Sequence, residues 1–232
     1  MYATRNAGGL LLGAALMAGC SECNGQAGLT GTRSGVFSAD VAAGKTSVVL
    51  DPVGDAANKA QAYQDVVRAE ITTQGGNFVF VMDLAAPLPD NPSVPSKADV
   101  ILWLFALDTD PTEFQVGYPH NGAEPWEFFV ELRQYREGFT DPLDPTRSAG
   151  VLVDRRPLFT GGQATVTPIQ FSIKGTKIAW VVDAASLGDP STFKWASGTA
   201  SAHANDDAKT GYAAGVVIFD VAPDVDLAAW PQ

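Results

Sequence analysis

The feature that most constrains this chain is a succession of short β-branched and aromatic runs separated by Gly, Pro, Asp and Asn. Such runs are typical of strands joined by turns, and their number and spacing favour an all-β sandwich with few helices. The predicted strands are Thr46–Asp51, Asp65–Thr73, Asn77–Leu84, Asp99–Leu107, Trp126–Gln134, Gly150–Arg155, Thr165–Ile173, Lys177–Asp183 and Tyr212–Val221. We expect one domain over residues 46–222, followed by a C-terminal tail, 223–232.

Two short glycine-containing segments predict hairpin turns. Gly75-Gly76 and Gly175-Thr176 each lie between two apolar runs, as expected for tight connections between antiparallel strands. The runs 77–84 and 101–107 are almost continuously apolar, which indicates strands covered on both faces. A single helical turn is expected over 184–187.

The N-terminus has the layout of an export signal. Arg5 precedes an apolar run of about a dozen residues, whereas a helix needs about 20 residues to cross a bilayer. The sequence Leu16-Met17-Ala18-Gly19-Cys20 resembles the lipobox of bacterial lipoproteins, which implies that residues 1–19 are a lipoprotein signal peptide and that Cys20 is lipidated. The alternative is an ordinary secretory signal that happens to have a cysteine near its cleavage site.

Residues 20–45 are rich in Gly, Ser, Thr and Ala, a composition that suits a flexible tether. Cys20 and Cys23 are the only cysteines, and a lipidated Cys20 cannot pair with Cys23, so we expect no disulfide. A redox reading of this Cys-x-x-Cys segment is less favoured because no βαβ pattern surrounds it.

The charge balance excludes one class of partner. The chain has 15 Lys and Arg against 26 Asp and Glu, a formal net charge of −11. Nucleic-acid binding depends on a cationic surface, so we expect no nucleic-acid partner.

Three stretches taken together resemble the DOMON-like β-sandwich superfamily, which includes family-nine carbohydrate-binding modules and the glucodextranase-like C-terminal domain. They are Leu50–Leu84 with its Asp-Pro-x-Gly-Asp opening, Ile101–Asp110 with a Trp-containing strand before Asp-x-Asp, and Phe171–Thr199 with a late hairpin, a short helical turn and a Trp-containing strand. The resemblance implies a jelly-roll-like antiparallel sandwich, often with structural calcium, that serves as an extracellular binding module. Some members bind sugars and others bind haem.

Three aspartates are candidate metal ligands. Asp51, Asp55 and Asp65 flank a loop with Pro52 and Gly54, and carboxylates converging in such a loop suit calcium, which takes oxygen ligands. The alternative is that these residues only shape the turn. Two weaker candidates for a metal site are the pair Asp108 and Asp110 and the pair Asp206 and Asp207.

One loop combines aromatic faces with hydrogen-bonding groups and is the predicted ligand site. Its candidate residues are Tyr118, His120, Asn121, Glu124 and Trp126. Flat aromatic rings can stack on sugar rings, and loops on a rigid sandwich often carry binding residues. The alternative is a surface loop that binds no ligand. Of the other tryptophans, we expect Trp103 and Trp180 to pack in the core.

No catalytic motif is evident in the sequence, which lacks an HExxH helix and a G-x-S-x-G elbow. We therefore expect a non-catalytic lipoprotein of the bacterial cell envelope that binds carbohydrate and holds structural calcium. The membrane is contacted through the lipid anchor only. The alternative partner is an envelope protein, with the sandwich as an interaction module without sugar affinity. A third reading, haem-dependent electron transfer, would need a ligand such as Met82, which core packing explains better.

Overall fold

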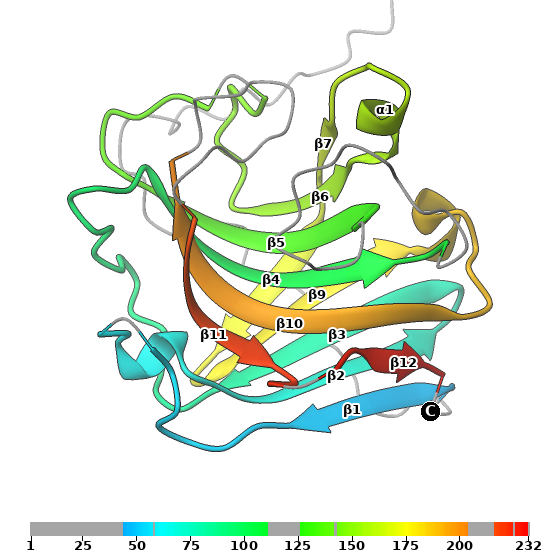
Figure 1. The fold of residues 1–232 in the computed structure, drawn as a ribbon, viewed down its shortest axis with the longest axis horizontal. Coiled ribbons are helices and arrows are strands. Elements are labelled where there is room, and N and C mark those ends of the chain that lie inside the picture. Colours follow the sequence, from blue (N-terminus) through cyan, green and yellow to red (C-terminus); the bar gives the residue numbers. More distant parts are fainter. Residues whose placement is uncertain are drawn as a thin grey trace, which may run out of the picture.

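The computed structural model describes residues 44–57, 59–110, 126–141, 143–203, 216–224 and 226–231. These residues form an all-β sandwich of two antiparallel sheets (Figure 1), as predicted. The strand order of the first sheet is β1 (Thr46–Leu50), β2 (Val66–Gln74), β3 (Asn77–Leu84), β9 (Lys177–Asp183) and β8 (Gln170–Lys174). The order of the second is β11 (Val217–Ala222), β10 (Phe193–Ala202), β4 (Val100–Asp108), β5 (Phe128–Tyr135), β6 (Gly150–Asp154) and β7 (Thr165–Pro168), and β12 (Ala228–Trp230) also pairs with β10.

Both predicted hairpins are present. Gln74 pairs with Asn77 across Gly75-Gly76, and Lys174 pairs with Lys177 across Gly175-Thr176, so each loop has two residues. Gly75 and Gly76 have φ angles of 58° and 84°, a left-handed conformation that glycine adopts at little cost. The glycines therefore set the register of strands β2 and β3.

The core lies between the two sheets and is rich in aromatic side chains. Trp103, Trp180 and Trp195 are fully buried, as is Met82, which confirms the core packing predicted for Trp103, Trp180 and Met82. The Phe105 ring contacts Trp180 edge-to-face at 5.8 Å and Trp195 at 5.7 Å between ring centroids. Because these residues come from β4, β9 and β10, aromatic contacts join the two sheets.

The predicted strand Thr165–Ile173 is two strands in different sheets. β7 pairs with β6 in the second sheet, and β8 pairs with β9 in the first. Pro168 has no N–H group and ends the ladder with β6, after which the Ile169 N–H donates to the Gly150 carbonyl at 3.0 Å. The prediction was wrong here because a continuous run of β-forming residues does not show where the chain changes sheets.

Two strands were missed by the pattern of apolar runs. β10 is the longest strand in the described part of the chain and pairs with β4 from Lys194 to Ala202, but its second half consists of small residues with little apolar alternation. The segment 223–232, expected as a tail, contains β12, whose Trp230 is buried. The short helix α1 (Arg156–Phe159) was also not predicted, whereas the expected helical turn is present as η2 (Ala184–Leu187).

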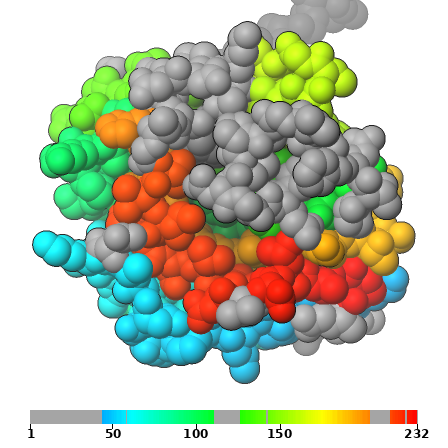
Figure 2. Space-filling view, viewed as in Figure 1, coloured from blue at the N-terminus to red at the C-terminus, as the bar shows by residue number. Residues whose placement is uncertain are grey.

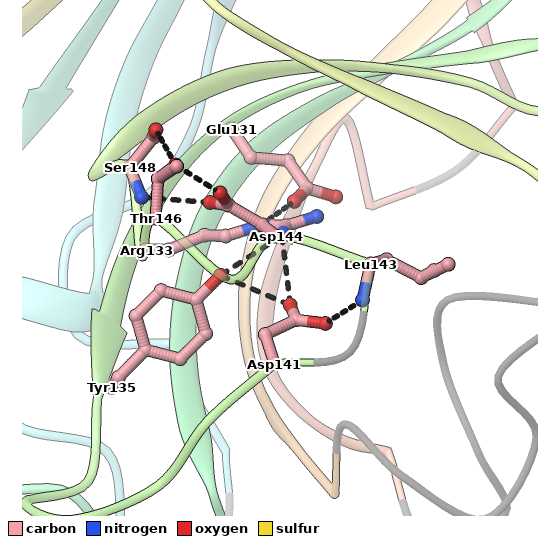
Figure 3. A network of polar contacts seen from close by, with 8 residues as sticks. All are labelled: Glu131, Arg133, Tyr135, Asp141, Leu143, Asp144, Thr146 and Ser148. Atoms are coloured by element: carbon pink, nitrogen blue, oxygen red, sulfur yellow. Dashed lines mark hydrogen bonds and ion pairs between the residues drawn. The ribbon is translucent and has the colours of Figure 1, made fainter.

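A buried polar network holds the connection after β5 against the outer face of the second sheet (Figure 3). Arg133 Nε donates to Glu131 at 2.7 Å, and its Nη1 donates to Asp141 at 3.1 Å and to the Tyr135 hydroxyl at 3.0 Å. Asp144 accepts bonds from the Ser148 backbone and the Thr146 hydroxyl. Since all of these groups have partners, the network orders this segment without leaving a buried charge unpaired.

Candidate functional site

Five aspartates from distant parts of the sequence meet at one place on the sandwich. We call them the acidic cluster: Asp51, Asp55, Asp65, Asp220 and Asp224. The first three lie between β1 and β2, and the last two lie in and after β11. Figure 2 shows the red atoms of the C-terminal strands beside the blue and cyan atoms of residues near β1 and β2. The sandwich thus joins two segments that are more than 150 residues apart in the sequence.

The spacing of the carboxylates suits a single cation. Oxygen atoms of Asp51, Asp55 and Asp224 all lie within 4.8 Å of one another, and the same is true of Asp55, Asp65 and Asp220. Two oxygens that bind one calcium ion at about 2.4 Å can be at most about 4.8 Å apart. Each group of three is therefore close enough to share an ion, and Asp55 belongs to both groups.

Backbone hydrogen bonds fix the cluster. The Gly54 N–H donates to Asp65 Oδ2 at 2.8 Å, and the Val66 N–H donates to Asp220 Oδ2 at 2.5 Å. The Ala57 N–H also donates to the Phe219 carbonyl at 2.6 Å, which joins the loop after β1 to β11. The carboxylates of Asp65 and Asp220 are therefore held in place before any ligand binds.

Two carboxylate oxygens in this cluster are buried without a hydrogen-bond donor. Asp65 is only 5 % exposed, and although its Oδ2 accepts from Gly54, its Oδ1 has no partner. Asp51 Oδ2 is likewise buried and unpaired. A buried polar atom left without a partner is destabilising by about 1–3 kcal/mol. A cation bound by the group to which each aspartate belongs would give its buried oxygen a partner.

The pKa values also show that charged carboxylates are unfavourable at this position. Burial and the negative charges of Asp220, Asp224 and Asp55 raise the pKa of Asp51 from 3.8 to about 7. Burial raises the pKa of Asp220 to about 6, although N–H groups of Val66 and Val221 partly oppose this effect. Without a cation, the folded protein therefore holds protons here that the unfolded chain has already released.

Within the described part of the chain, no Lys, Arg or His side chain forms an ion pair with the carboxylates of the acidic cluster. Across the described ranges, Lys and Arg side chains pair with other acids, such as Arg68 with Glu70 and Arg133 with Glu131. Clustered hard oxygen ligands suit calcium, which accepts irregular arrangements of 6–8 oxygens, better than magnesium, which demands near-octahedral geometry. The acidic cluster therefore has the charge, spacing and unpaired atoms of a calcium site.

Sequence reasoning found three of the five residues. Asp51, Asp55 and Asp65 were predicted together, and the structure places Asp55 beside both of the others. Asp220 and Asp224 were missed because only the packing of β11 beside β10 brings them to the loop. One signal was available: Asp220 is a charged residue within an apolar run, Val216–Val221.

The other predicted metal candidates do not form such a group. Asp108 is buried at the end of β4, and Asp110 follows it, but in the described part of the chain neither belongs to a group of three ligating side chains. Asp206 and Asp207 lie outside the described residues.

Most of the predicted ligand loop is outside the described residues. This applies to Tyr118, His120, Asn121 and Glu124. Trp126 is half-buried and packs on the outer face of the second sheet against a cluster that includes Ala106, Phe129 and Val153.

The predicted lipidation site, Cys20, also lies outside the described ranges, together with the signal peptide and most of the tether. Among the described residues, none of the helices has the length and apolar character needed to cross a membrane.

Comparison with known proteins identified no relative of this chain. No protein family model matches the chain, and no curated protein or solved structure resembles it significantly. The function is therefore inferred from the residues themselves.

Proposed function

We propose that this protein is a calcium-stabilised, non-catalytic binding module of the bacterial cell envelope, anchored through Cys20, and that its ligand is a carbohydrate. The calcium site consists of the acidic cluster, with Asp51, Asp55 and Asp65 as the ligands expected from the sequence. Asp220 and Asp224 complete the set of carboxylates.

The observation that carries the proposal is the unpaired Asp65 Oδ1. Asp65 is 5 % exposed, it is held by the Gly54 N–H, and one of its carboxylate oxygens lies within 4.8 Å of oxygens of Asp55 and Asp220. A bound calcium ion supplies the missing partner and offsets the repulsion between the carboxylates. A loop that only needed to turn would not require three aspartates placed against two more from β11 and the residues after it.

A carbohydrate ligand is supported by the architecture and by the resemblance of the sequence. A rigid sandwich can present binding groups from its loops, and the lipid anchor would hold those groups at the cell surface. The buried aromatic core makes the sandwich rigid. Four of the five tryptophans are fully or nearly fully buried, so few tryptophans remain at the surface to stack on a sugar ring.

Calorimetric melting of the purified full-length protein tests the proposal. We expect calcium to raise the melting temperature, a chelator to reverse the increase, and a suitable soluble polysaccharide to raise it further. Asp65→Asn keeps an acceptor for the Gly54 N–H but should lose the calcium response. The control Asp189→Asn, at an exposed position outside the cluster, should keep it.

Two outcomes would count against the proposal. A wild-type melting temperature that does not change with calcium would exclude the metal site. A calcium response without any polysaccharide response would favour the alternative, a module that docks a protein of the envelope.

A further inference from the structure

A cleft lies away from the acidic cluster, where the segment after β4 approaches α1 and η2. Its volume is about 330 Å³, at the lower end of the range for small-molecule sites. Figure 1 shows α1 and η2 on the same side of the sandwich. The side chains used in the argument below are Asp110, Glu127, Arg156, Phe159 and Thr160.

Glu127 is the buried acid of this cleft. It is 3 % exposed, and its Oε2 accepts a hydrogen bond from the Thr109 N–H at 2.7 Å. Its Oε1 is also buried and has no partner among the described residues. Burial raises the pKa of Glu127, while the backbone N–H groups of Thr109, Asp110 and Glu127 act in the opposite direction. The free oxygen therefore lacks a hydrogen-bond donor, which a ligand can supply.

Arg156 provides a donor in the same cleft. Its Nε and Nη2 bind Asp154 at 3.0 and 2.7 Å, and its Cζ lies 4.5 Å from the centroid of the Phe128 ring. These contacts hold the guanidinium rigidly but do not use Nη1. Nη1 lies on the side facing Gly188, 3.6 Å from where a Cβ would stand on that residue, which is an ordinary van der Waals distance.

The chemistry of the cleft selects the class of ligand. A carboxylate oxygen that needs a donor and a guanidinium N–H that needs an acceptor together fit hydroxyl groups, because a hydroxyl both donates and accepts. A cationic amine would meet the positive charge of Arg156, and an anion would meet Glu127 and Asp110. The Phe159 side chain adds an apolar wall. These groups favour a neutral polyol.

We propose that this cleft binds one residue of a neutral saccharide, with Glu127 Oε1 accepting from one hydroxyl and Arg156 Nη1 donating to a neighbouring oxygen. This inference rests on the proposed carbohydrate function and gives it a site that the sequence did not suggest. The predicted ligand loop is attached at the same place, because Asp110 lines the cleft and Trp126 directly precedes Glu127.

Affinity electrophoresis tests the site directly. The purified full-length protein is run in native gels that contain dextran, xylan, galactomannan or laminarin, and retardation gives the dissociation constant. We expect at least one polysaccharide to retard the wild type. Glu127→Gln preserves size and an acceptor for Thr109 but replaces the free oxygen with a donor, and it should weaken binding about 10-fold or more.

A second variant guards against a folding defect. Thr160 is exposed at the edge of the cleft, so Thr160→Trp should fill the space without disturbing the core, and it should also reduce retardation. Glu137→Gln removes one negative charge from an exposed position elsewhere and should bind as the wild type does. Unchanged melting temperatures in the absence of polysaccharide would show that the variants are folded.

The possible results separate this inference from the proposed function. If the wild type is retarded and both cleft variants are retarded equally, the cleft is not the site, but carbohydrate binding stands. If no polysaccharide retards the wild type, both proposals fail. If calorimetry shows that spermidine binds in a Glu127-dependent manner while no polysaccharide binds, the ligand class is wrong.

Discussion

The substitution Asp51→Asn separates the repulsion within the acidic cluster from its capacity to bind calcium. Asp51 lies beside four other aspartates, and its pKa is raised from 3.8 to about 7. At pH 8 the metal-free protein must keep this group charged against its neighbours. Asparagine has nearly the same shape and no charge, so the variant should be more stable than the wild type in the presence of a chelator.

The size of the effect follows from the shift. At 1.36 kcal/mol for each unit of pKa, a change from 3.8 to about 7 corresponds to at most about 4 kcal/mol. Solvent screens a partly exposed group, so we expect about 1–2 kcal/mol. For a domain of this size, that gain should raise the melting temperature by roughly 2–8 °C.

Calcium should reverse the order of the two proteins. If the dissociation constant is about 10⁻⁴ M, about 10 mM calcium stabilises the wild type by about 2.7 kcal/mol. The variant lacks one carboxylate and should gain much less. The wild type should therefore melt lower than Asp51→Asn in chelator and higher than it in calcium.

The pH dependence provides the control. Because the folded-state pKa of Asp51 is raised, the metal-free wild type should lose stability as the pH rises from about 4 to about 7. Near pH 5 Asp51 is mostly protonated when folded, so the advantage of the variant should shrink. A variant that is less stable than the wild type in chelator at pH 8, or a difference that persists unchanged at pH 5, would refute the reasoning.

Three further predictions test other parts of the protein. Arg133→Met leaves the buried Asp141 without its guanidinium and should reduce the free energy of unfolding by about 3–5 kcal/mol, measured by urea denaturation; a loss below about 1 kcal/mol would contradict the network's role. Gly198→Ala places a Cβ 2.5 Å from the Asp220 carbonyl, so it should displace β11, cost about 1–3 kcal/mol and weaken the calcium response; an unchanged response would show that β11 can shift freely. Cys20→Ser should abolish incorporation of labelled fatty acid and release the protein from the membrane fraction; continued labelling would exclude Cys20 as the lipidation site.

Local sequence patterns were sufficient for the hairpin of β2 and β3 in the first sheet. The runs 66–74 and 77–84 are joined by two glycines that can adopt the left-handed conformation, so both the hairpin and its register follow from neighbouring residues. The predicted burial of Trp103 and Trp180 was correct for the same reason. Large apolar side chains in uninterrupted apolar runs are usually buried in the core.

The same patterns were insufficient where a strand forms only because it pairs with strands that are distant in the sequence. β10 contains Ala, Ser and Gly where a typical strand has branched residues, yet it occupies the interior of the second sheet because β4, β11 and β12 all pair with it. Its Gly198 allows the Asp220 carbonyl to approach closely. Small residues such as Gly, Ala and Ser have low strand propensity, so the local sequence does not indicate a strand where they allow two strands to approach closely.

The sequence by itself therefore determined the all-β class, the tight hairpins, the aromatic core and the aspartate-rich loop with Asp51, Asp55 and Asp65. Only the tertiary structure decided that Asp220 and Asp224 join this loop and that Glu127 is buried in a cleft with Arg156. The physical reason is that strand alternation and turn conformation depend on adjacent residues. The charge density of a site and the burial of a carboxylate depend instead on which distant segments the packing brings together.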